Sequence, residues 1–141
     1  MTNKLLSQFD EAWTRWLTVL DQVDPARRDD KVLDDNWTVK DLVAHNLFWD
    51  AEVLTDIQRW RLGLPAVSND WQGMNDLNHA AHQSRPYDLL RVEMHLVHQI
   101  VRDAIATLPN DLPAEFVEQI AADTWDHYDD HTQQIEEWLK K

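Results

Sequence analysis

The side chains best suited to chemistry in this chain are its seven histidines. His127 and His131 are four residues apart, so on a helix they lie on one face, one turn apart. The spacing of Ile120, Ile135 and Trp138 predicts that this is also the apolar face and that both imidazoles lie in the middle of its buried stripe. Buried imidazoles need partners for their ring nitrogens, and a metal ion shared by the pair is one way to supply them.

His45 is the third candidate ligand, because it flanks the apolar face of an earlier helix that antiparallel packing can bring to the level of the pair. Three neutral imidazoles without a fourth protein ligand form the open arrangement of a catalytic metal site. Nitrogen ligands favour zinc, nickel, copper or iron(II) over magnesium or calcium, and the chain has no cysteine to offer a thiolate. The residues alone leave another interpretation open, in which the histidines pair with acids or lie at a subunit interface.

Four further side chains are candidates to line a substrate pocket beside these histidines: Trp49, His98, Trp125 and Tyr128. For His98 and the two tryptophans, packing in the core is the competing and more common role. Second-layer hydrogen bonds to the ligating imidazoles are expected from His98, Asp41 or Glu52. No residue is assigned a catalytic role.

The elements that must position these residues are helices, because apolar residues recur three and four apart throughout the chain. Four long helices are predicted over residues 5–23, 38–62, 84–108 and 113–139. Thr38 is the expected N-cap of the second, with Asp41 completing a capping box, and Gly63 is its expected stop. A loop from Gly63 to Gly73 and a short helix over 75–83 precede the third long helix. The fold class is therefore all-α: a four-helix bundle, one domain over residues 1–141, whose long connection is a candidate mobile cover for the site.

Composition excludes several classes of function. The 141 residues carry 13 basic and 26 acidic side chains, a net charge of −13, which would repel a phosphate backbone or an anionic membrane. Only two glycines are present, ten residues apart, so nucleotide-cradling loops are ruled out. No apolar run approaches the roughly 18 residues of a spanning helix, and the first residues lack the apolar segment of a signal peptide. We therefore expect a cytoplasmic protein without nucleic-acid or membrane partners.

Two histidine-bearing motifs, WTVKDLVAH at 37–45 and TWDHYDDH at 124–131, resemble those of the DinB/YfiT-like superfamily, with its ClbS/DfsB-type branch most similar. The resemblance covers essentially the whole chain. It implies a four-helix bundle, often a homodimer, that holds a divalent metal, commonly zinc or nickel, on His45, His127 and His131. Characterised relatives include thiol-dependent transferases and isomerases that use an external low-molecular-weight thiol, and self-protection proteins that hydrolyse reactive electrophiles.

Two functional hypotheses follow. In the first, the three-histidine site activates a thiol or a water for attack on an electrophilic small molecule, as in an S-transferase or a hydrolase. In the second, the protein is a non-catalytic bundle without metal that binds or sequesters a small molecule or acts as a dimeric interaction module. A carboxylate-bearing thiol would need basic groups near the histidines, and helical positions do not bring Arg59, Arg61, Arg91 or Arg102 to that level.

Overall fold

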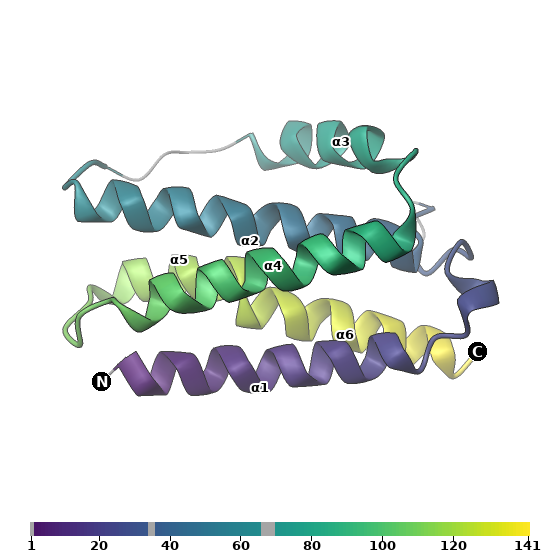
Figure 1. The fold of residues 1–141 in the computed structure, drawn as a ribbon, viewed down its shortest axis with the longest axis horizontal. Helices are drawn as coiled ribbons and strands as arrows, with labels where there is room; N and C mark the ends of the chain where they lie inside the picture. Colours follow the sequence, from purple (N-terminus) through teal and green to yellow (C-terminus); the bar gives the residue numbers. More distant parts are fainter. Residues whose placement is uncertain (1, 34–35, 66–69) are drawn as a thin grey trace.

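The computed structural model describes residues 2–33, 36–65 and 70–141, and within them the chain is helical, as predicted. The elements, in chain order, are α1 (Thr2–Asp21), the 3-10 turn η1 (Pro25–Arg27), α2 (Val39–Arg61), α3 (Trp71–His82), α4 (Tyr87–Ala106), α5 (Ala114–Asp123) and α6 (Trp125–Leu139). In Figure 1, α1, α2, α4 and the end-to-end pair α5–α6 lie alongside one another, and α3 lies on the outer side of α2. The predicted bundle with a short extra helix after the second long helix is confirmed.

The start and end of α2 are set by local interactions. Thr38 Oγ1 accepts a hydrogen bond from the Asp41 amide at 3.2 Å, and Asp41 Oδ2 accepts one from the Thr38 amide at 3.0 Å, which is the predicted capping box. At the other end Gly63 has φ 69°, a left-handed conformation that glycine adopts without steric cost, so the predicted stop is also confirmed. These two signals fix the length of the helix that carries His45.

The prediction of one continuous helix over 113–139 is wrong, because the chain breaks at Thr124 (φ −123°, ψ −99°) into α5 and α6. The Thr124 hydroxyl donates to the Ile120 carbonyl at 2.6 Å, while the Thr124 amide bonds to Ala121 instead. A side chain that takes the carbonyl four residues back competes with the helical ladder. The helical period therefore does not continue from Ile120 to His131, so apolar positions before the break do not define the buried face after it.

The predicted start of the short helix at Asn75 is also wrong, because α3 begins at Trp71 and contains Gly73 in its first turn. The carboxylate of Asp70 accepts a hydrogen bond from the Gly73 amide at 3.0 Å and so caps the helix earlier than the glycine suggested. A Cβ at Gly73 would lie 2.4 Å from Asp70 Oδ2, so glycine leaves room for this cap. Residues 66–69 of the expected mobile cover lie outside the described part of the chain.

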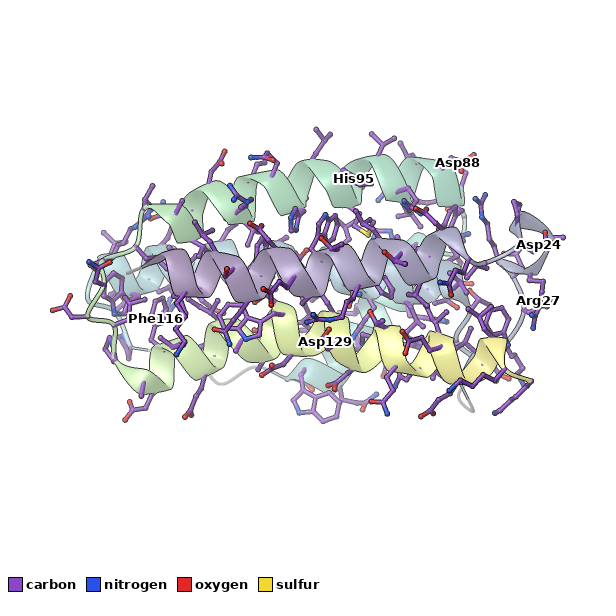
Figure 2. All side chains as sticks on the ribbon, turned by 90° about the horizontal axis from the view of Figure 1, so that it is seen from below. Asp24, Arg27, Asp88, His95, Phe116 and Asp129 are labelled. Carbon is purple, nitrogen blue, oxygen red and sulfur yellow. The ribbon has the colours of Figure 1, made fainter. Side chains whose placement is uncertain are left out.

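One apolar core is shared by α1, α2, α4, α5 and α6. Figure 2, in which α1 is seen in front, shows side chains filling the space between α1, α4 and the α5–α6 pair. Trp16 is completely buried there, and its indole N–H donates to the sulfur of Met94 at 3.4 Å. Three ion pairs link α1 to its neighbours at the surface: Arg15 with Asp129 and Arg102 with Asp10, each at 2.8 Å, and Arg91 with Asp21 at 3.6 Å. Within the described residues, no helix is long and apolar enough to cross a bilayer.

We predict that Thr38→Ala lowers the free energy of unfolding by about 1 kcal/mol, because it leaves the first turn of α2 without its cap. The measurement is urea denaturation at pH 7. Thr14→Ala is the matched control, since the Thr14 hydroxyl is exposed and bonds only within α1, to the Asp10 carbonyl. Equal losses in the two variants would contradict the capping role of Thr38.

Candidate metal centre

The three predicted histidines come together between α2 and α6. The Nε2 atom of His127 lies 2.7 Å from that of His45 and 2.9 Å from that of His131. The candidate ligand atoms of all three lie within 4.8 Å of one another. His45 and His131 are 7% and 8% exposed, and His127 is half-buried. Residues that are more than eighty positions apart in the sequence thus converge on one point.

Three neutral imidazoles cannot make hydrogen bonds at both of these N···N contacts. His131 Nδ1 lies 2.5 Å from the amide oxygen of Gln134, so Nδ1 carries the proton and Nε2 presents a lone pair. His127 Nε2 touches both other rings, yet it holds either one proton or one lone pair. At least one of the two N···N contacts is therefore not a hydrogen bond between neutral rings. A cation shared by three lone pairs removes this conflict.

The cluster is neutral at physiological pH. Burial, with a smaller contribution from His131, lowers the pKa of His45 to about 3. Burial also lowers the pKa of His127 well below its usual value and lowers that of His131, where the bond to Gln134 acts in the opposite direction. Neutral imidazole is the form that binds a metal.

These observations test whether a divalent metal fits the residues present, and it does. The donor set is three neutral nitrogens, which suits zinc or nickel, and one ligand is oriented by a hydrogen bond to Gln134. No Asp or Glu belongs to the cluster in the described chain. The set is one ligand short of the tetrahedral four, which leaves a position open, as in catalytic zinc sites.

Two cavities adjoin the cluster beneath α3. One, of about 360 Å³, is lined by His45, Trp49, Trp71, Asn75, Asp123 and His127. The other, of about 450 Å³, is lined by Leu33, Trp37, Trp71, Gln72, Asn75, Asp76, His79 and His131. Trp71 and Asn75 of α3 belong to both, and Asn75 Oδ1 accepts a hydrogen bond from the Trp49 indole at 2.8 Å. α3 therefore forms a shared wall of the space in front of the histidines.

Of the four side chains predicted to line a substrate pocket, Trp49 lines this space, and the other three are not among the described residues that line the two cavities. Trp125 and Tyr128 lie on the buried face of α6, which also includes His131, Thr132, Ile135 and Trp138. The break at Thr124 resets this face, so the inner side of α6 is centred nearer Tyr128 and Thr132, and His127 lies at its edge rather than in the middle of the stripe. Tyr128 is completely buried and donates to Asp50 Oδ2 at 2.6 Å.

His98 is a core residue instead of a pocket residue. Its ring stacks on Trp13, with 3.7 Å between ring centroids, and on Phe9, with 4.5 Å between centroids. Side chains of α1 thus cover His98, which is 7% exposed. Burial lowers the pKa of His98 to about 3, so it is also neutral.

The hydrogen bonds around the three imidazoles also differ from those predicted. Asp41 bonds to Thr38 and to the Gln83 amide, and the imidazole it approaches is that of His79, at 3.4 Å. In the described part of the chain, no hydrogen bond joins His98 or Glu52 to a ligating ring. The partner found is Gln134, one turn after His131, and this spacing of a histidine and a glutamine is the sequence signal that could have indicated it.

Sequence reasoning also missed a group of acids beside the cluster. Asp123 lines the first cavity, and burial together with the nearby charges of Asp56 and Glu52 raises its pKa to about 7. Asp50 is completely buried, and burial raises the pKa of that carboxyl well above its usual range. No Lys or Arg is among the residues that line either cavity.

Comparison with known proteins bears on the fold. No protein-family model matches the chain, and no curated protein matches it in sequence. Two solved structures superpose over 99% of it: an uncharacterised protein from Escherichia coli UTI89 (TM-score 0.84, 21% identity, 93% of that chain) and a protein described as "Sibling Lethal Factor Precursor - DfsB" (TM-score 0.80, 17% identity, 95% of that chain). The chain has the DfsB-type helical-bundle fold. At these identities the fold is what is shared, and the wider DinB/YfiT relationship stays a resemblance.

We predict that His98→Phe makes the protein more resistant to acid. Below pH 6.5 the unfolded chain takes up a proton at His98 while the folded chain does not, so this residue's contribution to stability is lost as pH falls from 6.5 towards 3. Phenylalanine keeps the stack and removes the titration. The free energy of unfolding of the variant minus that of the wild type should rise by about 2 kcal/mol between pH 7 and pH 5. A constant difference across this range would contradict the neutral, buried state of His98.

Proposed function

We propose that His45, His127 and His131 bind a divalent metal, zinc or nickel, and that the protein activates a water or a thiol there for attack on an electrophilic small molecule. This is chemistry of the hydrolase or S-transferase type. The observation that carries the proposal is the convergence of three neutral Nε2 atoms whose contacts cannot all be hydrogen bonds. The resemblance to a family with metal-dependent members supports the same assignment.

The residues around the cluster have different roles, which follow from their positions. A bound divalent ion lowers the pKa of a coordinated water or thiol towards neutrality and so supplies a nucleophile at physiological pH. Gln134 holds the His131 ring with its Nε2 lone pair directed at the cluster. Trp49, fixed by its bond to Asn75, and Trp71 form walls against which a substrate packs.

The charge around the site favours a water, or a thiol without carboxylates, as the nucleophile. None of Arg59, Arg61, Arg91 and Arg102 lines either cavity. Their contacts lie elsewhere: Arg59 with the Pro65 carbonyl, Arg61 with Thr107, Arg91 with Tyr87 and Asp21, and Arg102 with Asp10. A carboxylate-rich thiol would find no counter-charge there.

A cytoplasmic location and a homodimer, as in the family that the chain resembles, belong to the same proposal.

One observation favours the alternative, a metal-free bundle that sequesters a small molecule. The Nδ1 atoms of His45 and His127 are buried and have no hydrogen-bond partner among the described residues. Metal-ligating histidines almost always donate this second N–H, and here only His131 does. The cavities beside the cluster would then be the whole of the functional site.

We expect protein prepared without a polyhistidine tag and loaded with zinc or nickel to retain about one ion per chain after desalting, measured by elemental analysis. His127→Ala/His131→Ala should retain none. His82→Ala/His95→Ala removes the same number of imidazoles outside the cluster and should bind like the wild type. A wild type that stays metal-free, or a double variant in the cluster that binds as well as the control, would refute the metal centre and leave the sequestering alternative.

Gln134→Ala should weaken metal binding by about 10-fold to 100-fold, because the His131 ring loses the acceptor that fixes its tautomer and orientation. Gln133→Ala is the control, since Gln133 is exposed and bonds to Glu137 on the outer face of α6. The measurement is competition for zinc with a chromophoric chelator at pH 7. Equal affinities of the two variants would show that Gln134 does not position His131.

A further inference from the structure

The space in front of the histidines has walls of an unusual composition. Three indoles line the two cavities: Trp49 in one, Trp37 in the other and Trp71 in both. Trp71, the first residue of α3, is 61% exposed, so its indole is accessible to a ligand. Trp37 stacks on His79 with 5.3 Å between ring centroids, so its ring is held in a fixed plane. Indole faces carry the negative side of the ring quadrupole and attract cations.

The formal charges of the same walls have one sign. Asp123 lines the first cavity and Asp76 the second, and no lysine or arginine lines either. The arginines that flank α3 in sequence are bound elsewhere: Arg59 to the Pro65 carbonyl, Arg61 to Thr107 and Arg85 to Glu93. The acids in front of the histidines therefore have no basic side chain as a partner in the lining.

The surroundings of Asp123 disfavour the negative charge of its carboxylate. Burial and the charges of Asp56 and Glu52 act on it in the same direction, against ionisation. Asp50 is completely buried, its Oδ1 atom has no hydrogen-bond partner among the described residues, and the charge of Asp123 opposes its ionisation as well. A cation in the cavity would relieve this repulsion, whereas an anion would add to it.

We propose that the small molecule taken by this site is an organic cation, one that carries a protonated or quaternary amine beside a flat or apolar group, held by Asp123 and the faces of Trp49 and Trp71. The inference deepens the proposed function, on which it rests for the identity of the site, by naming the substrate class. Asp123 lines the same cavity as His45 and His127, so the cationic end of the ligand lies at the acid and the reacting end at the cluster.

The test uses benzyltrimethylammonium as the probe, because its charge does not change with pH, with benzyl alcohol and benzoate as neutral and anionic counterparts. Binding is measured by calorimetry at pH 8, with both metal-free and zinc-loaded protein. We expect the cation to bind metal-free protein at least about tenfold more tightly than either counterpart, since charge and indole contacts each contribute. Benzoate binding as tightly as the cation would overturn the proposal.

Matched variants locate the interaction. Asp123→Asn should weaken binding of the cation about tenfold or more, whereas Asp103→Asn, which removes the same charge from the exposed side of α4, should leave it within about twofold. Trp71→Leu keeps an apolar side chain and removes the indole face, so it should weaken binding of the cation more than that of benzyl alcohol. Equal effects of Asp123→Asn and Asp103→Asn would refute the assignment, and thermal unfolding would verify that each variant is folded.

The outcomes separate this inference from the metal proposal. Selective binding of the cation by protein that never retains zinc would support the ligand class and refute the metal-dependent function. Stoichiometric zinc without preference for the cation would refute the ligand class and leave the metal centre intact.

Discussion

The contact of three imidazoles between α2 and α6 is the constraint on which the rest of this structure depends. Burying neutral rings is affordable only where their nitrogens find partners. Here two N···N contacts of 2.7 and 2.9 Å share one central nitrogen, which hydrogen bonding alone cannot satisfy. The fold therefore holds three imidazole nitrogens together in contacts that cannot all be hydrogen bonds.

Packing and ion pairs elsewhere in the bundle hold the three imidazoles in contact. α6 lies between α2, which carries His45, and α1, to which it is fastened by the two-pronged pair of Arg15 and Asp129. The break at Thr124 matters because it decouples α6 from α5, so α6 can rotate to bury Tyr128 while keeping His127 at the margin of the core. A side chain at the margin can contact both the cluster and a cavity, which His127 does.

A helix outside the four-helix bundle, α3, contributes to the candidate site. α3 lies on the outer side of α2 and contributes Trp71 and Asn75 to both cavities, so it shapes the space in front of the histidines. The excess of acidic side chains in the chain extends to this space. Asp76 and Asp123 line it, and no Lys or Arg is among its described lining residues. The acidic side chains that give the chain its negative net charge thus also bear on which small molecules would fit this space.

Sequence alone determined what depends on near neighbours along the chain. The capping box of Thr38 and Asp41, the left-handed Gly63 and the shared face of His127 and His131 are local features, because hydrogen bonds and helical spacing link residues within one or two turns. The position of His45 beside the apolar face of its helix made it the third candidate, and the motif resemblance supported it. Tertiary structure decided the rest: the Thr124 break, the burial of Trp125 and Tyr128, the stacking of His98 on Trp13, and the approach of Trp71 to the cluster. These depend on which helix covers which face, and periodicity cannot carry that information across a break or from one helix to another.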